Sequence, residues 1–223
     1  MEILVNLEEL GIFTLVLCVL WLYLPGYLVN TFAMMWGKWL PKTGYGPWPI
    51  DGGRIHKDGN RILGDGKTWN GLIGGSLTSG LLAIFMVWIV SGNDLNNAPF
   101  VDISINDTGI GTASFLNLGW VGSAFYMGSL LGFFSLVGDS TGSFLKRRRG
   151  LKREGDVSSK APLLDTLPFA IFTFIGGLVF LPSTYHSAEG VWIGMIGLLI
   201  LTPIIHRAFN ILGYKLGWKD VPY

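Results

Sequence analysis

Long apolar stretches without a charged residue alternate along the chain with short polar segments. The charge-free stretches are Leu10 to Gly37, Thr68 to Asn93, Thr108 to Gly138, Thr166 to Ala188 and Gly190 to His206. A helix needs about 20 mostly apolar residues to cross a bilayer. The pattern therefore predicts an all-α integral membrane protein with five transmembrane helices. We expect these over approximately 10–37, 68–92, 110–138, 166–182 and 190–212; the last passes Arg207, whose long side chain reaches back to the membrane surface.

The composition agrees with that interpretation. Half of the 223 residues are hydrophobic and only 14% are charged, whereas a soluble domain carries about a quarter charged residues. We expect residues 1–223 to form a single polytopic membrane domain. The N-terminal segment has no basic region, and no small-residue cleavage site follows it, which favours a retained first helix over a signal peptide. We expect no nucleic-acid partner, and the sequence leaves the oligomeric state open.

Basic residues occur on one side of the predicted membrane only. Six lie in the first loop (38–67), seven lie between Lys146 and Lys160 in the third loop (139–165), and three lie in the C-terminal segment; these are all 16 Lys and Arg residues of the chain. Loops rich in Lys and Arg stay in the cytoplasm. We therefore expect the N-terminus outside, the C-terminus in the cytoplasm and two functional loops on the cytoplasmic face of the cell membrane.

The first cytoplasmic loop combines glycine, aspartate and basic residues. Asp51, Asp58 and Asp65 are separated by glycines, and Lys67 and Thr68 open the second predicted helix. Glycine-rich turns and a helix N-terminus both present backbone N–H groups to phosphate oxygens. The GDGKT segment lacks the glycine spacing and the preceding strand of a P-loop. The alternative is a solvated loop in which Asp65 and Thr68 cap the second helix.

The second cytoplasmic loop carries an acid at each end and a basic cluster between them. If the third helix continues past Gly138, Asp139, Ser143, Lys146 and Arg147 lie on one face. Asp165 begins the next apolar stretch, where its alternative role is a helix N-cap before Pro168. Two carboxylates at the ends of neighbouring spans are suited to share a divalent cation that bridges phosphates. The outer basic residues, from Arg149 on, are typical of a contact with anionic lipid headgroups.

These residues resemble the signature of a known family. Gly138-Asp139, Ser143-Phe144 and Lys146-Arg147, followed by Pro162 and Asp165, are similar to the motif of the CDP-diacylglycerol synthases, membrane cytidylyltransferases that activate lipid phosphates with CTP. The short five-helix form and the RILGDGKT segment more closely resemble the archaeal, CDP-archaeol-forming branch of that family. The resemblance covers most of the chain, from about Asn30 to Asn210.

The resemblance implies a reaction and a set of residues. CTP and an unsaturated isoprenoid ether lipid phosphate would give the CDP-lipid and pyrophosphate, with Mg²⁺ as the cofactor. The implied catalytic residues are Asp139, Asp165 and Lys146, and the two aspartates would hold the metal. The implied nucleotide-binding residues are Gly64, Asp65, Gly66, Lys67, Thr68, Ser143, Phe144, Lys146, Arg147, Arg148 and Pro162. From its position after the Pro25-Gly26 pair in the first helix, Asn30 is a further candidate to recognise the base or a phosphate.

Other functions remain open at this point. The acceptor could be another lipid phosphate. A CDP-alcohol phosphotransferase carries its acids within one motif, and the segment from Asp51 to Arg54 lacks the rest of that spacing. A small transporter would need ionisable groups at the bilayer midplane, whereas the basic residues of this chain gather at one face. A structural membrane protein with a basic headgroup-binding loop would leave the repeated Gly-Asp units without a role.

Overall fold

Five α-helices make up the protein in the computed structural model, which describes residues 11–92, 99–100, 118–151, 162–181 and 189–215. The helices are α1 (Ile12–Trp39), α2 (Trp69–Gly92), α3 (Gly119–Arg148), α4 (Pro162–Phe180) and α5 (Glu189–Lys215), with a short 3-10 helix, η3 (Leu40–Thr43), after α1. Each α-helix is long and apolar enough to cross a membrane. The described ranges contain isolated β-bridges but no strand. The predicted all-α class is therefore confirmed, with five helices that are long and apolar enough to span a membrane.

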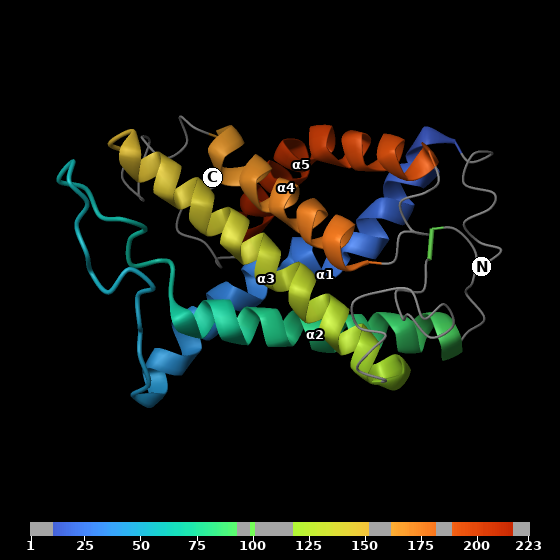
Figure 1. Ribbon diagram of the computed structural model, residues 1–223, viewed down its shortest axis with the longest axis horizontal. Helices are drawn as coiled ribbons and strands as arrows, with labels where there is room; N and C mark the ends of the chain where they lie inside the picture. Colours follow the sequence, from blue (N-terminus) through green and yellow to red (C-terminus); the bar gives the residue numbers. More distant parts are fainter. Residues whose placement is uncertain (1–10, 93–98, 101–117, 152–161, 182–188, 216–223) are drawn as a thin grey trace.

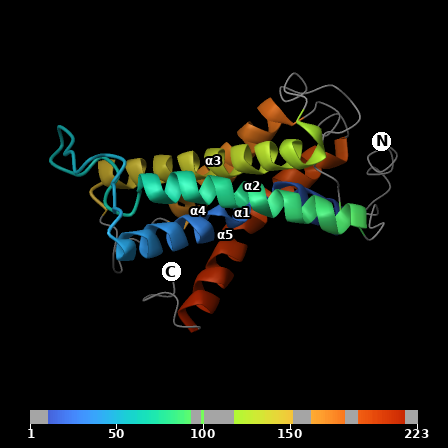
Figure 2. The same ribbon diagram turned by 90° about the horizontal axis from the view of Figure 1, so that it is seen from below.

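The helices form a bundle in which α2 and α3 cross and α1 lies behind them (Figure 1). The C-terminal end of α1, the segment 40–68, the start of α2 and the end of α3 meet at the same end of the molecule (Figures 1 and 2). The C-terminal half of α5 diverges from the other helices (Figure 2). One end of the bundle thus gathers the segments that carry most of the polar residues.

The core is apolar and depends on close helix packing. Tyr23, Met127, Leu131 and Leu198 are fully buried. Small residues bring the helix backbones together: a Cβ atom added to Gly128 would lie 2.4 Å from Cβ of Ala83 on α2. Such contacts are typical of membrane helices, in which small side chains allow close approach.

The third helix continues further than its charge-free stretch. α3 runs to Arg148 and α4 begins at Pro162, so most of the described part of the predicted loop 139–165 is helical. The end of an apolar stretch does not mark the end of a helix. Lys, Arg and Leu have high helix propensity, and cations are favourable near a helix C-terminus. The condition stated for the sequence is therefore met: one continuous helix carries Asp139, Ser143, Lys146 and Arg147.

Asp165 does not have its alternative role of helix N-cap, because it lies inside the first turn of α4. Several sequence-based expectations fall outside the described residues. These are the structures of the predicted outer loops and the roles of Lys152 and Arg153.

Candidate functional site

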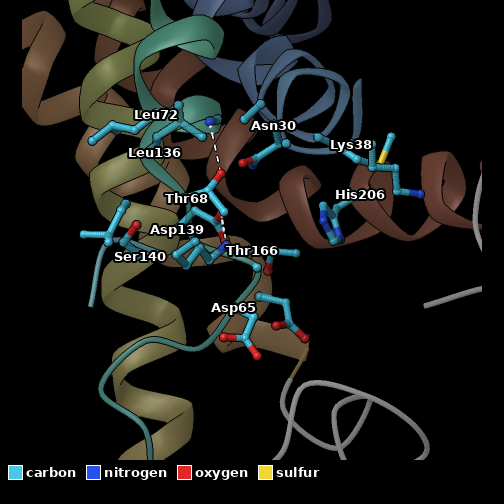
Figure 3. A pocket seen from close by; sticks show the side chains of 18 of the residues that line it. Asn30, Lys38, Asp65, Thr68, Leu72, Leu136, Asp139, Ser140, Thr166 and His206 are labelled. Atoms are coloured by element: carbon cyan, nitrogen blue, oxygen red, sulfur yellow. Dashed lines mark hydrogen bonds and ion pairs between the residues drawn. The ribbon is translucent and has the colours of Figure 1, made fainter. Parts of the chain in front are cut away.

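A cavity of about 1050 Å³ opens where the segment 40–68 meets all five helices. It is slightly larger than the range of about 300–1,000 Å³ that is usual for small-molecule sites. Its polar and charged lining residues are Asn30, Lys38, Asp65, Lys67, Thr68, Asp139, Ser140, Asp165, Thr166, His206 and Arg207. Figure 3 shows Thr68, Asp139 and Ser140 on one side of the cavity and Lys38 and His206 on the other, with Asn30 between them.

Two lysine–carboxylate ion pairs connect the elements on the first side. Lys67, just before α2, pairs with Asp139 of α3, and Lys146 of α3 pairs with Asp165 of α4. Each lysine contacts one carboxylate oxygen. The side chains of Lys67 and Asp139 are each 22% exposed, so the pair lies at the cavity surface rather than in the core. These pairs hold both candidate acids at the wall of the same cavity.

The start of α2 is capped by Thr68. Its Oγ1 atom accepts a hydrogen bond from the backbone N–H of Gly71 at 3.1 Å, the geometry of an N-cap. Asp65 has a different role from the predicted cap, because its carboxylate pairs with Nη1 of Arg61 at 2.8 Å and is 74% exposed. Thr68 and Gly71 both line the cavity, so the positive end of the α2 dipole faces it.

Asp51 organises the loop that precedes Lys67. Its buried carboxylate accepts hydrogen bonds from the backbone N–H groups of Gly53, Leu63 and Gly64 and from the Arg61 guanidinium. Burial acts to raise the pKa of Asp51, but the hydrogen bonds from Arg61 and from the three amides outweigh it and hold that pKa well below its usual range. The charged carboxylate therefore fixes the backbone from residue 51 to residue 64.

The last turn of α3 holds the tip of the same loop. Arg148 donates hydrogen bonds to Oδ1 of Asp58 and to the carbonyl oxygen of Arg61, both at 2.7 Å. Its guanidinium carbon lies 5.1 Å from the centre of the Phe144 ring, a cation–π contact. Arg147 donates to the carbonyl oxygen of Leu151. Phe144 and Arg148 thus bind the loop rather than line the cavity.

The structure brings seven of the fourteen sequence-predicted site residues to the cavity lining: Asn30, Asp65, Gly66, Lys67, Thr68, Asp139 and Asp165. Six others are not part of that lining: Gly64, Ser143, Phe144, Lys146, Arg147 and Arg148. The side chain of Pro162, the remaining one, lies outside the described part of the structure. Of the six, Lys146 reaches the site through Asp165. Gly64 has a backbone φ of 98°, and its Cα faces the Arg147 side chain. Ser143 is buried in α3, and Pro162 begins α4.

Sequence reasoning missed the contribution of α5 and, apart from Asn30, that of α1. Lys38, His206 and Arg207 line the cavity but lie in no recognisable motif. The only available signal was their position at the cytoplasmic ends of the first and last predicted helices. That signal also fits a topology or packing role, to which these residues were assigned.

The carboxylates in the cavity fit a metal that arrives with a phosphate ligand. Asp139 and Asp165 each have one oxygen outside their contact with lysine, and carboxylate oxygens are the ligands that Mg²⁺ prefers. Within the described part of the chain, no group of three or more His, Cys, Asp or Glu side chains is placed to hold a metal alone. Mg²⁺ usually keeps several waters and binds one or two carboxylates together with substrate phosphates, which matches this set.

Comparison with known proteins gives consistent results. Residues 12–223 match the family model described as CarS-like, CDP-archaeol synthase. The chain is 38% identical over 211 residues to the CDP-archaeol synthase of Picrophilus torridus, covering 94% of this chain and 97% of that protein. It is 35% identical over 204 residues to that of Thermococcus gammatolerans, covering 92% and 94% of the two chains.

A solved structure supports the fold. It is described as that of an intramembrane enzyme for archaeal membrane lipids biosynthesis, and it matches with a TM-score of 0.53 and 24% sequence identity. The match covers 86% of this chain and 92% of the other. At that identity the similarity is one of fold alone.

Proposed function

Because the chain belongs to the CDP-archaeol synthase family, we propose that it forms CDP-archaeol from CTP and an unsaturated isoprenoid ether lipid phosphate at the cavity between its five helices. The enzyme class, a CTP-using membrane cytidylyltransferase, follows from the family. The lipid acceptor, the dependence on Mg²⁺ and the residue roles given below are our proposal.

The reaction exchanges one phosphoanhydride bond for another. An oxygen of the lipid phosphate attacks the α-phosphorus of CTP, a new P–O bond forms, and the bond from the α-phosphorus to the α,β-bridging oxygen breaks. Pyrophosphate leaves with that electron pair. The attacking phosphate is already an anion at neutral pH, so the reaction needs no general base. It needs positioning and charge neutralisation instead.

The residues on the α2, α3 and α4 side of the cavity suit the triphosphate. Lys67 and Lys146 supply cations, and the capped start of α2 supplies a positive dipole end beside Thr68. Both lysines pair with carboxylates in the structure, so we propose that they turn toward phosphate oxygens when CTP binds. Asn30 lines the cavity between this side and the Lys38 side (Figure 3) and is placed to bind the base or a phosphate.

Asp139 and Asp165 would hold Mg²⁺ through the carboxylate oxygens that their lysines leave available. When bound there, the ion would neutralise triphosphate charge and stabilise the leaving pyrophosphate. Breaking the lysine contacts on CTP binding would leave both carboxylates able to bind the ion.

The observation that carries this proposal is the shared cavity of a chain of this family: two acids, Lys67 and the N-terminus of α2 line it, and Lys146 reaches it through its pair with Asp165. The direct test is release of pyrophosphate from CTP by the purified protein, with the ether lipid phosphate and with or without Mg²⁺. Turnover with a diacylglycerol phosphate but not with the ether lipid phosphate would overturn the assigned acceptor. Pyrophosphate release that persists without any lipid phosphate would overturn the reaction.

We also propose that the cavity faces the cytoplasm. All basic residues of the chain lie in the segments that the positive-inside rule assigns to that side. CTP is a cytoplasmic nucleotide, so this orientation brings the cavity to its substrate. The N-terminus would then lie outside the cell.

A further inference from the structure

The cavity holds two cations that its acids do not neutralise. Asp139 pairs with Lys67, Asp165 with Lys146, and Asp65 with Arg61. Lys38 and Arg207 also line the cavity, yet neither forms an ion pair with any residue in the described ranges. Two unneutralised cations in one cavity favour a second anion besides the triphosphate.

These cations come from α1 and α5, whereas the candidate nucleotide residues other than Asn30 come from the segment 64–68, α3 and α4. Lys38 is in the last turn of α1 and Arg207 is in α5. In Figure 3, Lys38 lies beside His206 and across the cavity from Asp139 and Ser140. The cavity therefore has two charged sides that come from different helices.

The second side has an apolar wall. Pro203, Ile204, Ala208 and Ile211 of α5 line the cavity beside Arg207, and Ile204 is 64% exposed. The C-terminal half of α5 diverges from the bundle (Figure 2), and this helix is apolar enough to lie in the bilayer. A ligand with a phosphate at Arg207 would meet hydrophobic surface directly beside it. That combination suits an amphiphile and not a nucleotide.

We infer that Lys38 and Arg207 form the subsite for the phosphate of the lipid acceptor, with the lipid chains lying along the wall made by α5. This inference rests on the proposed function, since it assigns the acceptor's place in the same cavity. A phosphomonoester carries up to about two negative charges at neutral pH, which two cations would neutralise as it approaches the triphosphate. The guanidinium of Arg207 provides a planar pair of donors for two phosphate oxygens.

The test uses the purified full-length protein in lipid nanodiscs and measures pyrophosphate release. We expect Lys38→Gln and Arg207→Gln each to raise the KM for the lipid phosphate roughly tenfold or more, with the KM for CTP changed by less than about twofold. Arg207→Lys should recover part of the loss because it restores the charge without the fork. Lys42→Gln and Lys215→Gln are matched controls: Lys42 lies in η3, directly after α1, and Lys215 lies in α5, and neither lysine lines the cavity.

The outcomes separate the subsite from the function. A wild-type protein that releases no pyrophosphate with any lipid phosphate contradicts the proposed function itself. An active wild type whose Lys38→Gln and Arg207→Gln variants change the KM for CTP, or change neither KM, overturns the subsite. If a variant is inactive but keeps the wild-type unfolding midpoint, direct binding decides: lost lipid-phosphate binding with retained CTP binding supports the subsite, and retained lipid-phosphate binding overturns it. If a Gln variant fails to fold, Arg207→Lys and Lys38→Arg provide the same comparison with the charge kept.

Discussion

The Nη1 atom of Arg148, in the last turn of α3, donates a hydrogen bond to Oδ1 of Asp58 at 2.7 Å, although the two residues are 90 positions apart in the chain. This contact, with the bond from Arg148 to the carbonyl oxygen of Arg61, fixes the loop that leads to Lys67. Arg148 resembles a nucleotide-binding residue in sequence, but it lies outside the cavity lining. We therefore assign it a positioning role.

Removing this contact should misplace Lys67 while leaving the helices that line the cavity in place. We expect Arg148→Ala to lower kcat/KM for CTP by roughly tenfold to a hundredfold, because small displacements of a positioning element are costly in catalysis. Asp58→Ala should have a similar effect, and the double variant should be little worse than either single one. Steady-state kinetics of the four proteins would measure this.

Arg149→Ala is the matched control for that prediction. Arg149 follows α3 directly and is exposed, and we expect its loss to change kcat/KM by less than about twofold. If the losses in kcat/KM caused by Arg148→Ala and Asp58→Ala were fully additive in free energy, the contact between Arg148 and Asp58 would not be what positions the loop. If Arg148→Ala changed only the affinity for CTP while the loop kept its protease resistance, Arg148 would be a phosphate ligand after all.

The spacing between α3 and α4 sets the positions of the two candidate metal acids. A Cβ atom added to Gly138 would lie 2.4 Å from the carbonyl oxygen of Pro168 and 2.8 Å from Cα of Phe169, so the helices would have to move apart. Gly138 immediately precedes Asp139 in α3. We expect Gly138→Ala to lower both the unfolding midpoint and kcat. Gly11→Ala is the control, since nothing lies within 4 Å of its added Cβ; equal effects of the two substitutions would contradict this reasoning.

The helix count could be predicted from the sequence because each span is a charge-free apolar stretch of the length that a bilayer requires. The end of α3 could not, because hydrophobicity stops at Gly138 while the helix continues through Arg148. Asp139 and Asp165 could be selected as candidates because ionisable groups at a membrane edge are uncommon. The lysines that pair with these acids could not be predicted, since a pattern along the chain does not show that Lys67 reaches Asp139.

The contribution of α5 was also beyond the sequence. Arg207 follows an apolar stretch as any topology-determining residue would, and only the three-dimensional arrangement shows that it lines the cavity. Conversely, the repeated Gly-Asp units of the first loop suggested that the whole loop binds phosphate. The carboxylate of Asp51 instead accepts hydrogen bonds from its own loop.

The lowered pKa of Asp51 makes the loop sensitive to acid. A free carboxyl group titrates near pH 4, and the folded loop holds the pKa of Asp51 below that value. The unfolded loop thus binds more protons in this range, so the stabilisation is complete above about pH 4 and is lost as pH falls through the folded pKa. We expect the exchange protection of the Leu63 and Gly64 amides, relative to unfolded peptides, to decrease from pH 5 to pH 3.

Asp51→Asn should remove that pH dependence. The variant loses hydrogen bonds to a charged acceptor, which typically stabilise by about 1.5–3 kcal/mol each, so protection of the Leu63 and Gly64 amides should already be low at pH 7 and vary little with pH. Hydrogen exchange measured by mass spectrometry on both proteins tests this. A wild-type loop whose protection rises on acidification would contradict the assigned sign.

The orientation in the membrane can be tested by labelling single cysteines. Cys18 is the only cysteine and is buried in α1, so a Cys18→Ser protein is a suitable background. With a membrane-impermeant maleimide on intact cells, we expect labelling of Ile105→Cys, between α2 and α3 in the sequence, and none of Lys57→Cys in the exposed first loop. Permeabilised cells should label both. The reverse pattern in intact cells would place the cavity outside.

Asp139 and Asp165 provide the most direct test of the metal assignment. We expect Asp139→Asn and Asp165→Asn each to abolish Mg²⁺-dependent pyrophosphate release, because an amide cannot supply the anionic oxygen that Mg²⁺ prefers. Each substitution leaves a lysine without its partner, but both sites lie at the cavity surface, so the unfolding midpoint should change little. Removing Mg²⁺ with a chelator should abolish turnover of the wild type, and adding Mg²⁺ back should restore it.

Lys146→Ala separates the two functions of the Lys146–Asp165 pair: it should weaken CTP binding while the Mg²⁺ dependence of its residual turnover persists. Wild-type turnover in either purified Asn variant would exclude that carboxylate as a metal ligand, and an unchanged CTP affinity in Lys146→Ala would assign this lysine to holding Asp165 alone.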